Sequence, residues 1–264
     1  MLYRKKIAQL TQTQNKTLLA TFKRKDKKMR RLTKASAMLM SAALFGSASA
    51  IAQDEVEASV GADLVSGYEW RGQDLGGFSV QPSITVGYKG LSLGAWGSVG
   101  LDKEDNKEFD LTLGYSTGGF SASVTDYWSL PYQAEDKYFQ YEAHKTIHVF
   151  EAQVGYDFGP VAVNWYTNFA GADGVNDDGD RAYSSYINIA APFKLGGLDW
   201  KAEIGATPWA TSFYADANGF AVCNFGVTAS KDIKVTDSFT LPAFAKLSFN
   251  PASESTYFVF GLSF

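Results

Sequence analysis

The feature that most constrains this chain is a two-residue repeat, found in twelve segments between Val56 and Phe264. Large apolar side chains alternate in each segment with small or polar ones, which is the period of a β-strand with two unlike faces. In the last segment the even-numbered residues from Phe258 to Phe264 are all apolar. Such a strand suits lipid on one face and a polar lumen on the other, but the edge strand of a soluble sandwich alternates equally well. The segments are 57–64, 78–86, 91–99, 109–115, 120–125, 150–157, 161–166, 186–189, 198–204, 221–228, 240–248 and 255–264.

The connections between these segments alternate between short and long. A soluble sandwich gives no reason for this alternation, whereas an outer-membrane barrel has short periplasmic turns and longer surface loops. The sequence therefore predicts an all-β fold, a twelve-stranded antiparallel transmembrane β-barrel over residues 53–264 with short periplasmic turns and longer extracellular loops. The short connections are 89–90, 116–119, 159–160, 194–197 and 232–238, and the long ones are 71–77, 102–108, 130–147, 171–181, 208–219 and 250–254.

Aromatic residues on the apolar face collect at the two ends of the segments. About ten residues per strand separate the two groups, which at roughly 3.3 Å per residue and a tilt near 40° gives about 25 Å, the height of the apolar band in such barrels. Two girdles of this kind are typical of barrel ends that meet lipid headgroups. The lower girdle contains Tyr88, Tyr115, Phe120, Tyr156, Phe158, Phe193 and Phe264, and the upper one Trp70, Phe78, Phe109, Trp128, Phe169, Tyr183 and Phe249.

Residues 1–52 predict a basic leader with a signal peptide that is removed. A basic stretch at 29–34 precedes an uncharged, mostly apolar run at 35–45, and small residues end two cleavage motifs, at Ala50 and at Ala52. The apolar run is about half of the ~20 residues that a membrane-spanning helix needs. The leader directs the chain out of the cytoplasm.

Charge divides the chain at the same point. Residues 1–52 hold 12 of the 24 lysines and arginines and one acid, so 12 basic and 27 acidic residues remain in 53–264, a formal charge of −15. An acidic body excludes nucleic acid as a partner, because its binders need a basic surface. Residues 1–28 are polar and very basic, so either Met29 is the true start or the basic region is unusually long.

Several short motifs in residues 60–170 resemble the TorF-type porin family. Tyr68-Glu-Trp-Arg-Gly72 follows the first segment and has that family's aromatic-x-aromatic-Arg-Gly pattern, and Trp96-Gly-Ser98 lies in the third segment. Asp126-Tyr-Trp128 is also similar to the family, whereas the final third of the chain matches only in general barrel character. The resemblance implies an outer-membrane channel and supplies no substrate.

The polar faces of the segments carry most of the strand charges, which are tolerated inside only if the lumen is wet or the charges pair. The acidic bias predicts a hydrated lumen that disfavours anions, and the alternative is that Asp199, Lys201 and Glu203 form a paired ladder on one strand. Inward aromatic residues predict a narrow pore. The lumen-facing candidates are Glu57, Asp63, Trp96, Asp110, Glu151, Asp157, Tyr166, Asp199, Lys201, Glu203 and Lys246.

Arg71 is expected at the rim of the barrel, after Trp70. Its guanidinium could fix the first loop by pairing with an acid such as Asp74, or it could form part of a constriction. Asp126 breaks the alternation by lying among apolar positions, which marks a bulge or the membrane rim.

Residues that could carry metal or catalytic chemistry are few. The acidic loop at 173–180 has oxygen ligands but lacks the EF-hand pattern, so a solvated loop is favoured over a calcium site. Cys223 is the only cysteine and is expected to be a small apolar residue on a strand. His144 and His148 are the only histidines, and no serine motif accompanies them as an outer-membrane phospholipase would require. We expect no enzyme, no metal and no cofactor.

The sequence predicts a porin in the outer membrane of a Gram-negative bacterium that passes small hydrophilic solutes through a narrow polar lumen. The alternative is a closed structural or adhesive barrel without transport, with a lumen filled by its own ion pairs and aromatic residues. The expected partners are outer-membrane lipids, the solute, and the barrel-assembly machinery, which would read the C-terminal strand ending in Phe264.

Overall fold

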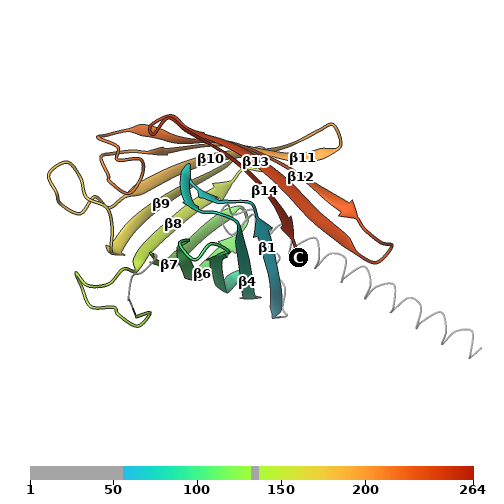
Figure 1. The fold of residues 1–264 in the computed structure, drawn as a ribbon, viewed down its shortest axis with the longest axis horizontal. Helices are drawn as coiled ribbons and strands as arrows, with labels where there is room; N and C mark the ends of the chain where they lie inside the picture. Colours follow the sequence, from blue (N-terminus) through green and yellow to red (C-terminus); the bar gives the residue numbers. More distant parts are fainter. Residues whose placement is uncertain (1–55, 132–136) are drawn as a thin grey trace, which may run out of the picture.

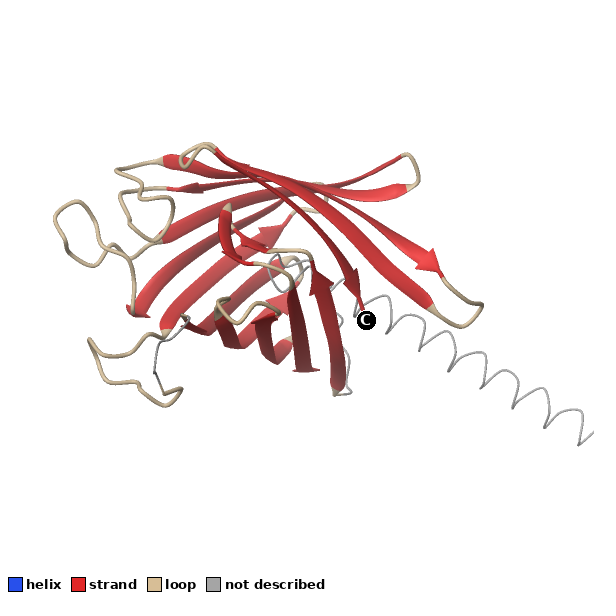
Figure 2. Cartoon of the chain, in the orientation of Figure 1, coloured by secondary structure: helices blue, strands red, loops and turns tan. Residues whose placement is uncertain are grey.

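The structure is a computed structural model that describes residues 56–131 and 137–264, and the predicted leader lies outside this range. The described residues form strands and loops without a helix (Figure 2). The strands are β1 (Glu57–Val65), β2 (Tyr68–Trp70), β3 (Gln73–Gly76), β4 (Ser79–Tyr88), β5 (Leu91–Gly100), β6 (Lys107–Thr117), β7 (Phe120–Leu130), β8 (Val149–Asp157), β9 (Ala162–Gly171), β10 (Ser185–Leu195), β11 (Leu198–Thr207), β12 (Ala221–Lys234), β13 (Thr240–Asn250) and β14 (Ser255–Ser263).

Twelve of these strands form one closed antiparallel barrel, in which each strand pairs with its neighbours along the chain and β14 pairs with β1 (Figure 1). The predicted twelve-stranded barrel is therefore confirmed. Each of the twelve alternating segments corresponds to one barrel strand. No helix in the described part of the chain is long and apolar enough to cross a membrane.

The alternation of short and long connections is confirmed except at the last pair, where loop 251–254 is one residue shorter than turn 235–239. We call the two ends of the barrel the turn end and the loop end. The turn end has the connections 89–90, 118–119, 158–161, 196–197 and 235–239, and the loop end has 66–78, 101–106, 131–148, 172–184, 208–220 and 251–254.

The barrel has an inverted distribution of polarity. Apolar side chains of the strands are exposed on the outside, including Val60, Leu93, Leu113 and Phe258. The buried residues are mostly polar or charged, because many of the side chains on the lumen faces of the strands are Ser, Thr, Asn, Asp or Glu. Fully buried side chains include Asn164, Asn168, Asn188, Asn224 and Asn250.

The ring closes through a short seam. Strands β1 and β14 share three register pairs, from Asp63↔Ser263 to Val65↔Gly261, whereas the other neighbouring barrel strands share between six and eleven. Backbone bonds between Ala62 and Phe264 extend the seam at one end, and the bond from the Ser66 amide to the Phe260 carbonyl (2.9 Å) extends it at the other.

The chain between β1 and β4 departs from the prediction of an outward surface loop. Residues 68–76 form a hairpin, β2–β3, which is a separate two-stranded sheet that pairs with no barrel strand. Its side chains contact β5, β6, β8 and β13, on different sides of the barrel, so the hairpin lies inside the lumen. The turn of the hairpin has left-handed backbone angles, with φ of 51° at Arg71 and 78° at Gly72.

Candidate functional site

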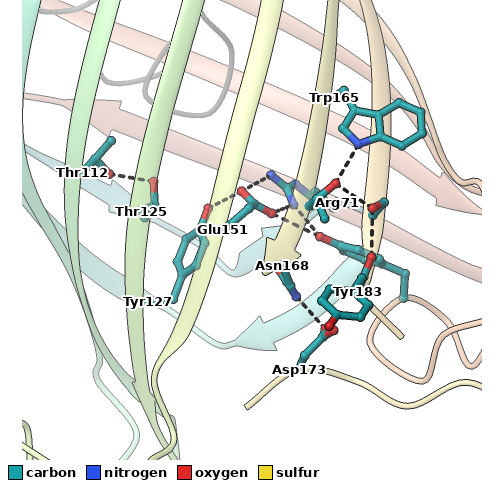
Figure 3. A network of polar contacts seen from close by, with 12 residues as sticks. Arg71, Thr112, Thr125, Tyr127, Glu151, Trp165, Asn168, Asp173 and Tyr183 are labelled. Carbon is teal, nitrogen blue, oxygen red and sulfur yellow. Dashed lines mark hydrogen bonds and ion pairs between the residues drawn. The ribbon is translucent and has the colours of Figure 1, made fainter. Parts of the chain in front are cut away.

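Arg71, at the tip of the hairpin, is the centre of the polar network in the lumen (Figure 3). Its guanidinium donates to both carboxylate oxygens of Glu151 on β8, with Nη1 2.5 Å from Oε2 and Nη2 2.9 Å from Oε1. Nη1 also donates to the Tyr214 hydroxyl at 2.5 Å, and the Tyr127 hydroxyl donates to Glu151 Oε1 at 2.9 Å. Both charged side chains are almost fully buried, with 3% and 2% of their surfaces exposed. The pair is therefore a bidentate, desolvated ion pair that joins the hairpin to the barrel wall.

Aromatic rings surround the same guanidinium. The Arg71 Cζ atom lies 4.3 Å from the ring centroid of Trp70, 4.0 Å from that of Tyr166, 4.8 Å from that of Tyr186 and 5.8 Å from that of Tyr214. These are cation–π distances, and the rings also contact one another. Tyr166, Tyr186, Tyr214 and Glu151 together are named the cage. They come from β9, β10, loop 208–220 and β8.

A second charge cluster holds the hairpin to the opposite side of the lumen. Lys246 Nζ on β13 lies 2.5 Å from Glu69 Oε2 of the hairpin and 3.2 Å from Glu203 Oε1 on β11. Lys201 Nζ lies 3.4 Å from Glu203 Oε2. Glu203 therefore pairs with Lys201, which is one half of the predicted ladder, whereas Asp199 pairs with Lys194 instead. Lys246 and Glu69 extend the network into the hairpin.

The backbone of the hairpin tip fits closely against the wall. A Cβ atom added to Gly72 would lie 2.0 Å from the Cys223 carbonyl oxygen. The Gly72 carbonyl accepts from Asn250 Nδ2 at 2.9 Å, and the Gly72 amide donates to Glu69 Oε1 at 2.7 Å. Only glycine combines the left-handed conformation with this close approach.

A cavity of about 230 Å³ opens beside the tip, toward the loop end. Three aromatic rings line it, those of Trp70, Tyr127 and Phe213, together with the carboxylate of Glu108. Glu108 Oε1 accepts from the Tyr68 hydroxyl at 3.3 Å. We call this space the mouth cavity.

The other predicted lumen residues fall into two groups. Trp96 and Asp110 lie opposite one another on β5 and β6, where Trp96 packs on Tyr68 with centroids 5.5 Å apart and Asp110 is buried. Glu57, Asp63, Asp157 and Asp199 do not join the network. Glu57 and Asp63 are half-buried on β1, Glu57 at its turn-end edge and Asp63 opposite Ser263. Asp157 and Asp199 lie at the turn end. Asp157 accepts there from the Gly159 amide, and Asp199 forms an exposed ion pair with Lys194.

Three positions require correction. Arg71 is predicted at the rim, either paired with an acid such as Asp74 or as part of a constriction. It lies instead inside the lumen and pairs with Glu151, while Asp74 accepts from the Gly76 amide. Trp70 was assigned to the upper girdle, but it is buried against the cage. Cys223 was assigned to the apolar outer face, but a β-bulge opposite Gly205 and Ala206 turns it into the buried lumen cluster.

Sequence reasoning missed five residues that hold the hairpin: Tyr68, Glu69, Tyr127, Tyr214 and Asn250. The density of aromatic and charged residues in Tyr68-Glu-Trp-Arg-Gly72 was the one available signal that this stretch is packed rather than solvated. Tyr214 carries no such signal because it lies in a loop. The structure places it, fully buried, between Arg71 and the rings of the cage.

A second polar site lies on the outside of the barrel near the loop end and explains the irregular position of Asp126. His148 is fully buried, with Nδ1 2.6 Å from Asp126 Oδ1 and Nε2 2.6 Å from the Tyr138 carbonyl. The Tyr141 ring packs against the imidazole in a tilted arrangement with centroids 4.4 Å apart, and its hydroxyl donates to Asp126 Oδ2 at 3.2 Å. Both ring nitrogens are engaged, so neither is open to take a proton from a nucleophile.

Replacing His148 with alanine is expected to release the described residues of loop 131–148 from the barrel wall. Loss of a charge-assisted bond costs about 1.5–3 kcal/mol, which raises the open population by roughly tenfold or more. Limited trypsin digestion at Lys137 and Lys145 should quicken accordingly. His144→Ala is the control, since His144 is exposed, and equal digestion rates for the two variants would contradict the anchoring role.

Comparisons with known proteins describe shape alone. No protein family and no curated protein matches this chain. Among solved structures, a chain from work on the in-meso crystallization of membrane proteins aligns over 80% of this chain and 83% of its own length, at 6% identity and a TM-score of 0.42. Salmonella typhi OmpF, solved in complex with daunomycin, aligns over 80% of this chain and 97% of its own, at 10% identity and a TM-score of 0.35. Likenesses this weak carry no argument about function, and the TorF-type resemblance stays a prediction.

Proposed function

We propose that the protein is an outer-membrane channel for small hydrophilic solutes, closed in this conformation by the β2–β3 hairpin. The inverted polarity of the barrel supports the membrane location, because a continuous exposed band of apolar side chains would make a soluble protein aggregate. The predicted leader of residues 1–52 and the Gram-negative outer membrane belong to the same proposal. So do outer-membrane lipids as surroundings and recognition of the C-terminal strand by the assembly machinery.

The channel proposal rests on which part of the chain fills the lumen. In small closed barrels the wall side chains themselves fill the interior, whereas twelve strands enclose more space than eight. Here the block is a separate hairpin, which is paired only with itself. Beside the hairpin tip the wall carries small polar residues, including Thr125, the register partner of Glu151, and Thr112, and their hydroxyls are 3.0 Å apart (Figure 3).

The proposed mechanism is diffusion through this polar lumen when the hairpin leaves its position. Release requires the Arg71–Glu151 and Lys246–Glu69 pairs to separate, and water that enters the lumen compensates the separated charges. The long connections at the loop end then set access. The proposal includes no catalysis.

A second candidate function is a closed structural barrel without transport. The two buried ion pairs favour it, since they anchor the hairpin to β8 and to β13, on different strands of the wall. In this case the hairpin would be permanent filling, and its side chains would contribute to stability alone.

Conductance in planar bilayers tests the proposal. Residues 67–77 would be replaced by an Asn-Gly turn, which the barrel accepts because Val65 and Ser79 are already register partners. We expect at most rare, brief openings from the unmodified protein and a steady current from the variant. A control lacking the exposed residues 177–179 should behave like the unmodified protein.

The outcomes separate the candidates. A variant that folds but carries no current at any voltage would support the structural barrel. Equal steady currents from the variant and the unmodified protein would show that the hairpin does not close the pore. Heat-modifiable migration on a denaturing gel reports folding in each case.

A further inference from the structure

The cage has the chemistry of a receptor for an organic cation. The Glu151 carboxylate meets the guanidinium of Arg71 through two parallel hydrogen bonds, the geometry that distinguishes guanidinium from a spherical cation. The rings of Tyr166 and Tyr186 lie over the same group. A carboxylate at one side and aromatic faces around the rest is the arrangement that recognises guanidinium and substituted ammonium ions.

The ion now in the cage belongs to a segment that shares no strand pairing with the wall. The hairpin makes no sheet with the wall, and Arg71 itself has a left-handed backbone conformation that is unfavourable for a residue with a Cβ. Arg71 therefore occupies the cage as a ligand that is covalently tethered to the barrel, and the tether gives it a high effective concentration there. When it departs, Glu151 is left as a buried carboxylate without its cation.

We propose that the cage is a binding site for small guanidinium or ammonium compounds, and that such organic cations are the solute class of the channel. This inference rests on the proposed function for its transport part, whereas the binding part stands on the cage alone. A solute of this class takes the place of Arg71 in the contacts with Glu151 and the tyrosines. Binding of the solute in the cage therefore displaces the hairpin tip in the same step.

The mouth cavity provides a matching approach to the cage. It shares Trp70 with the hairpin and Tyr127 with the Glu151 network, and its carboxylate, Glu108, lies among aromatic rings. A cation entering from the loop end therefore meets a carboxylate and aromatic faces before it reaches Glu151. An anion would meet the carboxylate of Glu108 and the faces of aromatic rings along the same path.

Arg71→Gly is the variant that empties the cage. Glycine accepts the φ of 51° at this position, so the backbone of the hairpin tip is retained. The probe is guanidinium chloride at millimolar concentration, added on the loop side of a planar bilayer. We expect the variant to carry a larger current than the unmodified protein and guanidinium to block it, whereas urea, a neutral molecule of similar shape, leaves the current unchanged.

Two further variants control for charge. Arg71→Gly combined with Glu151→Gln removes the carboxylate, and we expect the concentration of guanidinium that blocks half the current to rise at least tenfold. Arg181→Gly removes an exposed arginine of loop 172–184 and should leave the current of the otherwise unmodified protein as it is.

The results distinguish the cage from the channel. If Arg71→Gly conducts and guanidinium and urea act alike, the cage proposal is wrong and the channel stands. If Arg71→Gly carries no current, the transport part of this inference is wrong, and thermal unfolding in detergent decides whether the cage binds cations. Guanidinium at the same millimolar concentration should then raise the melting temperature of Arg71→Gly relative to sodium chloride, and not that of the variant that also carries Glu151→Gln. Equal melting temperatures in the two salts would overturn the cage.

Discussion

Replacing Glu151 with leucine is expected to lower the free energy of unfolding by about 3–5 kcal/mol, the usual cost of leaving a buried charge without its partner. Arg71 stays charged at any accessible pH, so it cannot respond by losing its proton. The Tyr127 hydroxyl loses its acceptor in the same change. Equilibrium unfolding in urea, followed in phospholipid vesicles, measures the difference.

Two controls show whether burial is the cause. Asp199→Leu breaks the ion pair with Lys194, in which 62% and 83% of the side chains are exposed, and should cost no more than about 1 kcal/mol. Combining Arg71→Met with Glu151→Leu removes both buried charges and should recover most of the lost stability. A double variant as unstable as Glu151→Leu alone would contradict this account of the pair.

Gly72→Ala is expected to displace the tip of the hairpin. The left-handed conformation costs alanine about 1–2 kcal/mol, and the new methyl group would overlap the Cys223 carbonyl, which is backbone and cannot rotate away. We therefore expect a larger loss than the conformation alone explains, together with a leak current through the loosened lumen. Thermal unfolding and bilayer conductance measure the two effects.

The chain supplies a matched control for this change. Gly197, in the turn between β10 and β11, has a φ of 76° against 78° for Gly72, but an added Cβ would have no atom within 4 Å. Gly197→Ala therefore reports the cost of the conformation without the overlap. Equal destabilisation by the two substitutions would mean that the fit against Cys223 contributes nothing.

The barrel could be predicted from the sequence because its information is local. The alternation of side chains within each strand identifies its apolar face and its polar face. The lengths of the connections can also be read from the sequence without knowing which strands pair. Even the closing pair could be inferred, since an even number of antiparallel strands brings β1 and β14 together. Parity alone assigns Asn164 and Glu203 to the polar face, and both side chains are buried in the structure.

The contents of the lumen could not be predicted because they depend on contacts between distant residues. The alternation of β1 is interrupted at Val65 and Ser66 and resumes at Tyr68 and Trp70, and this interruption does not by itself show that the chain bends inward after Val65. Nothing near Arg71 identifies Glu151, 80 residues away, as its partner. The bulge that turns Cys223 inward is set by the register with β11, which no single strand reveals.

The three-pair seam between β1 and β14 bears on the order in which the barrel is made. All other neighbouring strands are joined by a single connection and can pair soon after they are synthesised. Strands β1 and β14 are the first and last of the barrel, so their pairing closes the longest loop of the chain, and their three register pairs offset little of that entropic cost. The hairpin continues directly from β1 and is bound to β13 through Lys246 and Asn250, so it ties the first strand to the last pair from within. The hairpin therefore helps to hold the two ends of the barrel wall together from inside the lumen. Barrels of variants with a weakened hairpin should assemble more slowly and should also leak.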